Sequence, residues 1–143
     1  VGLSGADEEN AFARLPGMSA ATTERLRHIA TEQLLPTVAA ADFANFSDAL
    51  FDFGQVVGNY FAPVQGGVFA NRLMCRLAEA LRARGVGGVG QSSWGPTLFA
   101  LVEDDDSANK LAAELAADDA WQACNFHVAA AMNRGAAARI EVS

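Results

Sequence analysis

Apolar residues recur at helical spacing through the first 84 residues of the chain. After Asp42 they form one continuous stripe: Phe43, Phe46, Leu50, Phe53, Val57 and Tyr60. Steps of three and four residues place these side chains on one face of a helix. The pattern therefore predicts a long helix capped by Asp42, whose aromatic face belongs to the core.

Three further helices are predicted around this one. A short helix over residues 7–15 ends at Pro16, and a second begins near Ser19, a favourable capping residue. Pro36 should kink or break the second helix, because it has no N–H for the helical ladder. A helix over residues 68–84 follows the aromatic one. The short connection between the second helix and the aromatic helix predicts an antiparallel pair.

The hydrophobic pattern changes after residue 85. Strands are predicted from short apolar or alternating segments at 86–90, 97–103, 121–132 and 138–142. The acidic run at 103–107 precedes an apolar helical pattern, so we interpret it as a helix start and not as a metal site. Helices followed by strands predict one α+β domain over residues 1–143. Its expected architecture is an antiparallel sheet of about four strands with helices packed on one face.

The composition narrows the classes of function. The formal net charge is −7 at pH 7, and 51% of the residues are hydrophobic. Excess negative charge repels phosphates, so no nucleic-acid partner is expected. No segment has the length and apolar character of a membrane span, so no membrane partner is expected. Cys75 and Cys124 are too few for a disulfide framework, which favours the cytoplasm. The first residue is Val1, which predicts a piece of a longer protein.

The richest chemical signal is the segment from Gly85 to Thr97. Its glycines stand at positions 85, 87, 88, 90 and 95, and polar residues follow at Gln91, Ser92 and Ser93. Glycines allow positive φ and close approach to a ligand, and successive amides in such a loop can bind an anion. The alternative is a long turn between a helix and a strand. Neither the dinucleotide fingerprint nor the P-loop pattern fits the spacing.

A second glycine segment follows Pro63. The segment Pro63-Val64-Gln65-Gly66-Gly67 is either an interhelical turn that begins at Pro63, which the sequence alone favours, or a loop directed at the same site. His28 and His127 are expected to be exposed, and His127 is kept as a weak candidate. No residue near Cys75 in the sequence is a suitable base, so no nucleophile is assigned.

Several of these motifs together resemble a known family. The resemblance is carried by Gly90-Gln91-Ser92-Ser93-Trp94-Gly95-Pro96-Thr97, by Gln65-Gly66-Gly67, and by Gly2-Leu3-Ser4-Gly5 with Glu8. The chain is similar to the C-terminal half of the beta-ribofuranosylaminobenzene 5'-phosphate synthase family, within the GHMP kinase superfamily. The resemblance implies a ferredoxin-like C-terminal domain. It also implies condensation of phosphoribosyl pyrophosphate with 4-hydroxybenzoate or 4-aminobenzoate, with loss of CO₂ and pyrophosphate, in methanopterin biosynthesis and C1 metabolism.

The resemblance also implies where a phosphorylated substrate would bind. The expected substrate- and phosphate-binding residues are Gly87, Gly88, Gly90, Gln91, Ser92, Ser93, Trp94, Gln65, Gly66 and Gly67. Trp94 would stack on an aromatic acid or pack against the sheet. Mg²⁺ is expected with phosphoribosyl pyrophosphate, or with ATP if the enzyme is a kinase. No residue is assigned as a protein metal ligand, and no catalytic residue is assigned.

The sequence also leads us to expect binding partners, and it leaves two alternative functions open. The superfamily's Gly-Leu-Gly-Ser-Ser nucleotide loop is absent, so an N-terminal half of the same protein is expected to complete the site. A homo-oligomer is expected because the face that contacts that half would be apolar. Two alternative functions stay open: the C-terminal domain of an ATP-dependent small-molecule kinase, and a non-catalytic ferredoxin-like ligand-binding or assembly domain.

Overall fold

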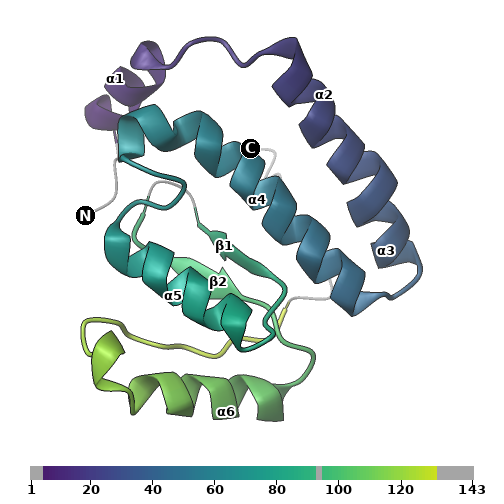
Figure 1. The fold of residues 1–143 in the computed structure, drawn as a ribbon, viewed down its shortest axis with the longest axis vertical. Coiled ribbons are helices and arrows are strands. Elements are labelled where there is room, and N and C mark those ends of the chain that lie inside the picture. Colours follow the sequence, from purple (N-terminus) through teal and green to yellow (C-terminus); the bar gives the residue numbers. More distant parts are fainter. Residues whose placement is uncertain (1–4, 93–94, 132–143) are drawn as a thin grey trace, which may run out of the picture. The chain divides into compact units, whose positions relative to one another are not determined.

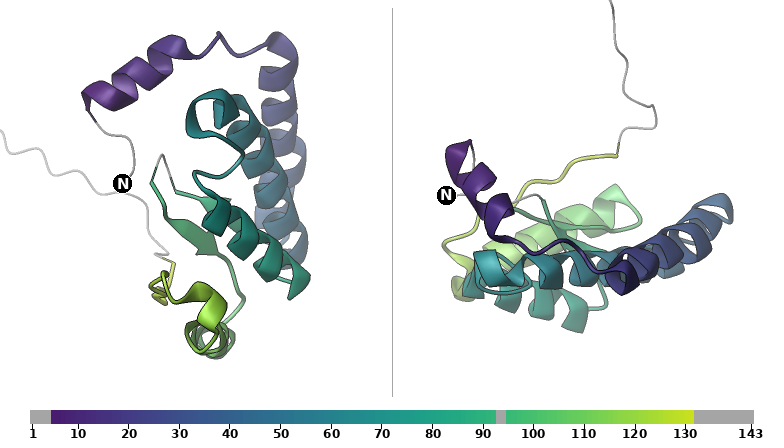
Figure 2. Two further views of the ribbon diagram at one scale, coloured as in Figure 1. Left: turned by 60° about the vertical axis from the view of Figure 1, so that its left-hand side comes forward. Right: turned by 90° about the horizontal axis from the view of Figure 1, so that it is seen from above.

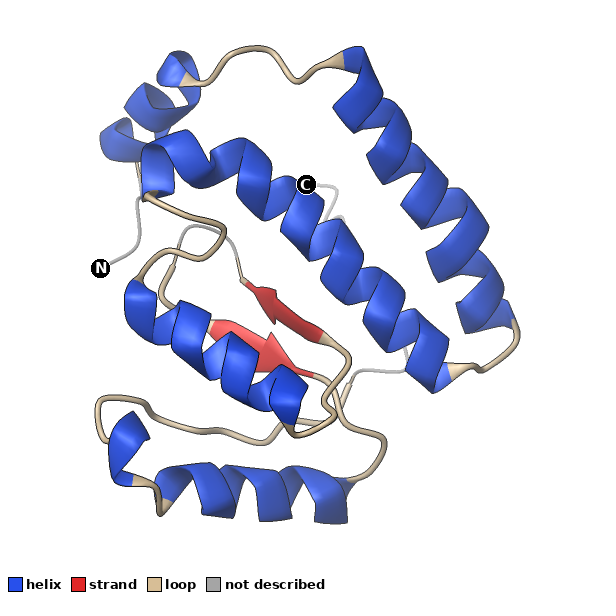
Figure 3. Cartoon of the chain, viewed as in Figure 1, coloured by secondary structure: helices blue, strands red, loops and turns tan. Residues whose placement is uncertain are grey.

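The computed structural model describes residues 5–92 and 95–131 of the chain. The fold is α+β with helices dominant (Figure 3). The chain divides into two compact units, residues 1–102 and 103–143. The single domain expected from the sequence stays a prediction.

The first unit contains most of the secondary structure (Figure 1). In chain order its elements are α1 (Ala6–Arg14), α2 (Ala20–His28), the π-helical turn η1 (Ile29–Leu34), α3 (Leu35–Ala39), α4 (Phe43–Gln65), α5 (Arg72–Ala83), β1 (Val89–Gln91) and β2 (Leu98–Ala100). The helices predicted from apolar periodicity are therefore confirmed. Ser19 caps α2 as expected, because its side chain accepts a hydrogen bond from Thr22 N at 3.1 Å.

Pro36 does not break the second predicted helix. The helix widens into η1 immediately before it, and Leu35 N–H bonds to Ala30 O, five residues back. The Thr37 hydroxyl donates to Gln33 O at 2.8 Å. The wider turn accommodates the proline, so α2, η1 and α3 form one continuous rod.

Helix α4 runs antiparallel to this rod and packs along it (Figure 1). Asp42 caps its N-terminus by accepting a hydrogen bond from Asn45 N at 3.1 Å. The helix continues through Pro63 to Gln65 and ends at Gly66, whose φ is 88°. The turn predicted to begin at Pro63 therefore begins three residues later. A left-handed C-cap favours glycine, which explains why the helix stops there.

The sheet is smaller than the sequence predicted. In the described residues it consists of β1 and β2, paired antiparallel with Val89 opposite Ala100 and Gly90 opposite Phe99. Leu98–Ala100 consists of half-buried residues and pairs with β1 alone among the described residues. Helix α5 begins at its N-cap Asn71 and packs against both strands (Figures 1 and 2).

The second unit contains α6 (Asp105–Ala116) and the short η2 (Asp119–Trp121). Asp104 caps α6 by accepting a hydrogen bond from Ser107 N at 2.7 Å, which confirms the acidic run as a helix start. The predicted strand at 121–132 is wrong over its described part, because η2 and a turn occupy 119–123 and no strand follows to 131. The predicted strand at 138–142 lies outside the described residues.

One cluster of core residues in the first unit lies between α4 and the α2–η1 rod. Ile29, Ala49 and Val56 are buried there, and Phe53 packs against them. The six residues of the aromatic stripe on α4 are half-buried. The stripe therefore contributes to the core only in part. Within the described ranges, no helix combines the length and apolar character required to cross a membrane.

Candidate functional site

The glycine segment begins as the C-terminal cap of α5. Gly85 has φ of 86°, its N–H bonds to Arg82 O at 3.0 Å, and Val86 N–H bonds to Leu81 O at 3.1 Å. This pair of bonds defines a Schellman motif, which requires a left-handed residue. Among the described glycines from 85 to 95, positive φ occurs at Gly85 alone. The other described glycines of the segment therefore do not use the freedom of positive φ that the sequence allows.

Gly88 and Gly90 are needed for a different reason, close packing. A β-carbon placed on Gly88 would lie 2.9 Å from Leu101 Cβ, and one placed on Gly90 would lie 2.7 Å from Phe99 Cε1. Distances this short are not tolerated by carbon atoms. Both glycines are buried. The space beside them is occupied by side chains of the same unit.

The hairpin also uses the backbone amides of this segment. Leu101 N–H bonds to Gly88 O at 2.7 Å, and Ser92 N–H bonds to Thr97 O at 2.9 Å. Alternate residues of an antiparallel strand bond to the partner strand, and Gly90 lies midway between Gly88 and Ser92. Its N–H therefore faces β2. The exposed Ser92 side chain remains accessible, and Ser93 and Trp94 lie outside the described residues.

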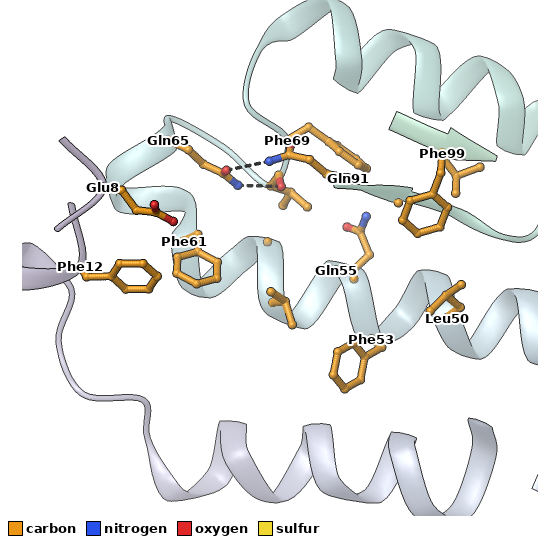
Figure 4. A pocket seen from close by; sticks show the side chains of 16 residues that line it. Glu8, Phe12, Leu50, Phe53, Gln55, Phe61, Gln65, Phe69, Gln91 and Phe99 are labelled. Carbon is orange, nitrogen blue, oxygen red and sulfur yellow. Dashed lines mark hydrogen bonds between the residues drawn. The ribbon is translucent and has the colours of Figure 1, made fainter. Parts of the chain in front are cut away.

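The two glycine segments meet through a pair of glutamines. Gln91 Nε2 donates to Gln65 Oε1 at 3.2 Å, and Gln65 Nε2 donates to Val68 O at 2.9 Å (Figure 4). Gln65 Nε2 also lies 2.9 Å from Gly67 O. Gln91 Oε1 accepts from Ala70 N at 2.7 Å. The structure therefore brings Gln65 and Gln91 together, while Gly66 supplies the exposed C-cap of α4. The main function of both amides here is to attach the 66–71 segment to β1.

Arg82 holds the start of the glycine segment by a hydrogen bond to the Gly87 carbonyl. Its Nη1 donates to Gly87 O and to Asp48 Oδ1, both at 2.7 Å, and its guanidinium lies 4.5 Å from the centre of the Phe51 ring. A β-carbon on Gly87 would lie 3.0 Å from Ser47 Cβ. The bond from Arg82 to a loop carbonyl was not predicted from the sequence.

A cavity of about 470 Å³ opens between α1, α4 and the hairpin (Figure 4). Most of its lining is apolar, and five rings contribute to it: Phe12, Phe53, Phe61, Phe69 and Phe99. Leu50, Phe53 and Val57 come from the stripe on α4 that the sequence assigned to the core. Gly90 and Gln91 also line it, so the cavity adjoins the predicted glycine site.

Four polar side chains line this cavity: Glu8, Gln55, Gln65 and Gln91. The amides of Gln65 and Gln91 bond to each other, whereas no hydrogen bond joins the Gln55 side chain to another described residue. Figure 4 shows Glu8 reaching in from α1 beside Phe12 and Phe61. None of the described lining residues carries a positive charge. The cavity therefore suits a neutral apolar group, not a phosphate.

Sequence reasoning missed the cavity because a helical stripe predicts which residues share a face, not what covers that face. A signal was present in Gly54 and Gly58, which lie beside the stripe on the helix and carry no side chain. A β-carbon on Gly54 would meet no atom within 4 Å, whereas one on Gly58 would meet Val68 O at 2.5 Å. Gly54 therefore faces open space, and Gly58 allows the 66–71 segment to approach α4.

The remaining candidates do not form a site. His28 and His127 are exposed, as the sequence predicted. Cys75 and Cys124 are half-buried free thiols. Over the described ranges, no cluster of three or more His, Cys, Asp or Glu side chains is arranged to hold a metal ion.

Comparisons with known proteins agree with the motifs. The chain is 24% identical over 102 residues to the beta-ribofuranosylphenol 5'-phosphate synthase of Methanothermobacter thermautotrophicus, covering 71% of this chain and 30% of that protein. The chain thus spans less than a third of the relative's length. No solved structure matches it. Residues 34–119 match the family described as GHMP kinases C terminal. This match includes α4, α5, the hairpin and α6, and the chain belongs to the GHMP kinases C-terminal family.

Proposed function

We propose that this chain is the C-terminal part of a synthase that condenses phosphoribosyl pyrophosphate with 4-hydroxybenzoate or 4-aminobenzoate. The observation that carries the proposal is the hydrogen bond between Gln65 and Gln91. It joins the two segments, 65–67 and 90–97, whose residues resemble this synthase family. The similarity to a beta-ribofuranosylphenol 5'-phosphate synthase supports the same reaction class.

The proposed reaction forms one carbon–carbon bond and breaks two bonds. The ring carbon that bears the carboxyl group bonds to C1 of the ribose as pyrophosphate leaves C1 with its electron pair. The carboxyl group then leaves as CO₂, and the electrons of that bond return to the ring. Charge develops on the leaving pyrophosphate, so preorganised donors near it lower the barrier.

The chain's own contribution to phosphate binding is proposed to come from the tip of the hairpin. The exposed Ser92 hydroxyl is a donor there, and Ser93 is expected to add another. The described residues form no cluster suited to a metal, so Mg²⁺ would arrive bound to the pyrophosphate as part of the substrate. The bound Mg²⁺ would neutralise part of the phosphate charge, which this chain cannot do by itself because its own net charge is −7.

The remaining cations and the catalytic residues are proposed to come from an N-terminal half of the same protein. The matched relative is more than three times as long as the region it shares with this chain, which leaves room for such a half. Assembly into a homo-oligomer and a cytoplasmic location accompany this proposal.

A second candidate is phosphoryl transfer from ATP to a small molecule, which the GHMP kinases family favours. One assay separates the two. The protein containing both halves is incubated with phosphoribosyl pyrophosphate, Mg²⁺ and carboxyl-labelled 4-hydroxybenzoate or 4-aminobenzoate, and labelled CO₂ and pyrophosphate are measured.

Equal release of both products supports the synthase, and the 143-residue chain alone should release neither. ADP formation from ATP with an alcohol acceptor, without CO₂ release, would support the kinase instead. Failure of both reactions, with ligand binding retained, would support a non-catalytic binding domain.

A further inference from the structure

The cavity between α1, α4 and the hairpin has the lining of a binding site for a small aromatic molecule. Its volume of about 470 Å³ lies in the range of ligand pockets. Five phenylalanine rings line it, and smaller apolar cavities already accept a benzene ring. Burial of a ring in such a cavity is driven by the removal of apolar surface from water.

The arrangement of these rings favours an aromatic over an aliphatic occupant. Phe12 and Phe61 meet edge to face, with centroids 6.0 Å apart and planes at 82°. Phe12 is 50% exposed, so part of its ring remains uncovered. Aromatic rings prefer edge-to-face or offset contacts with one another, and a bound ring can make such contacts here.

The charge of the cavity selects the substituents of the ring. Glu8 is the only ionisable residue among those described in the lining, and its carboxylate accepts hydrogen bonds. A carboxylate on the ligand would lie near Glu8 with no positive charge to pair with, which is unfavourable. A hydroxyl or amino group would instead donate to Glu8, and Gln55 offers an additional amide (Figure 4).

We propose that this cavity binds a neutral benzene ring that carries a hydrogen-bond donor, as in phenol or aniline, with Glu8 as the acceptor. The proposal rests on the proposed function for its biological meaning: the bound ring would be the hydroxyl- or amino-bearing end of the aromatic acceptor. The carboxyl group, on the opposite side of the ring, would then point away from Glu8 and out of the cavity.

The test is direct binding to the 143-residue chain, measured by nitrogen–proton NMR. The probes are phenol, aniline, benzoate and cyclohexanol, each titrated to millimolar concentration. Phenol and aniline should give saturable shifts that include the amides of Gly90, Gln91 and Phe99. Benzoate should bind about tenfold more weakly or worse because of the unpaired carboxylate. Cyclohexanol carries the same hydroxyl on an aliphatic ring and should bind more weakly than phenol. Cyclohexanol binding as tight as phenol binding would contradict the preference for an aromatic ring.

Variants test the location. Gly54→Leu directs a side chain into open space within the cavity and should weaken phenol binding about tenfold or more. Gly17→Leu is the matched control, because Gly17 also has open space around it but does not line the cavity. Gly54→Ala, a smaller change compatible with a helix, covers the case in which the leucine variant fails to fold. Glu8→Gln should raise the affinity for benzoate relative to phenol.

The outcomes separate this inference from the proposed function. Wild-type phenol binding by a folded Gly54→Leu variant, or benzoate binding as tight as phenol, would overturn the inference, even if the two-half protein releases CO₂ and pyrophosphate. Ring binding that Gly54→Leu removes, in a protein that releases neither product, would support the inference and count against the synthase.

Discussion

The ring of Phe99 occupies the space that a side chain on Gly90 would need. The two residues lie opposite each other in the β1–β2 pair, and a β-carbon on Gly90 would approach Phe99 Cε1 to 2.7 Å. An aromatic ring placed over a glycine on the neighbouring strand shields the exposed backbone. The glycine is therefore required by the partner strand, independently of any ligand.

The first prediction follows from this contact. Gly90→Val should lower the free energy of unfolding by about 1–3 kcal/mol, because overpacking forces side chains and backbone apart. Phe99→Ala in the same chain removes the clash, so the double variant should be more stable than the sum of the single effects predicts. Thermal or urea unfolding of the four proteins measures this coupling.

Gly54→Ala provides the control for that experiment. It lies inside α4 with no atom within 4 Å of the added carbon, so it should stabilise the protein by about 0.5–1 kcal/mol through helix propensity. A Gly90→Val protein as stable as wild type, with turnover lost in the two-half enzyme, would instead favour a ligand at Gly90.

The second prediction concerns the glutamine pair. Gln91→Ala leaves the Ala70 N–H without its acceptor at 2.7 Å and should cost about 1–3 kcal/mol. Gln91→Glu keeps that acceptor but loses the donor to Gln65 Oε1, so it should cost less than Gln91→Ala. Amide hydrogen exchange at Ala70 measures the local effect. Unchanged exchange at Ala70 in Gln91→Ala would contradict the assigned bond.

The third prediction separates the two bonds of Arg82. Arg82→Ala should cost about 1–3 kcal/mol, because it removes a charged donor from Gly87 O and a cation above the Phe51 ring. Asp48→Ala should cost less than about 1 kcal/mol, since the Asp48 carboxylate is 61% exposed. Unfolding in low and high salt tests this, because only the Asp48 contribution should be strongly screened.

The fourth prediction is a dependence on pH at the start of α6. Hydrogen bonds from Ser107 N at 2.7 Å and Ser107 Oγ at 3.0 Å lower the pKa of Asp104. A carboxylate with a lowered pKa in the folded state stabilises it above the unfolded pKa of about 4. That stabilisation is lost as the pH falls through the folded pKa.

Thermal unfolding of Asp104→Ala and wild type at several pH values measures this contribution. The difference between them should be largest near neutral pH and shrink in acid. Asp105→Ala removes a neighbouring carboxylate but no bond to Ser107, so it serves as the control. If the stability difference between Asp104→Ala and wild type grew in acid, the ionised carboxylate would not be the source of the stabilisation.

The fifth prediction tests the hairpin tip in the two-half enzyme. Ser92→Ala should lower kcat/KM for phosphoribosyl pyrophosphate and raise the barrier by ~1–3 kcal/mol if the hydroxyl bonds a charged phosphate. The fold should be unaffected, since the Ser92 side chain is exposed and its N–H bond to Thr97 O is retained. Ser107→Ala, outside the hairpin, should leave turnover at the wild-type value.

Local sequence patterns were sufficient to predict the positions of the helices and several of their ends. Spacing of apolar residues and the caps Ser19 and Asp42 are local properties, since each depends on neighbours within about one turn. The alternation at 121–132 was misleading because alternation becomes a strand only when a partner strand is present, and such pairing is not local. The motif residues Gln65 and Gln91 were found without the structure, but their contact was not.

The reason why Gly88 and Gly90 are required, and the surroundings of the stripe on α4, became visible in the tertiary structure alone. Strand pairing brings Leu101 and Phe99 against those glycines. Glu8 and Phe12 line the cavity from α1, which is far from the hairpin in the sequence. A periodic pattern specifies which residues share a face. The neighbour of that face, and the space left between the two, is set by contacts between residues far apart in the chain.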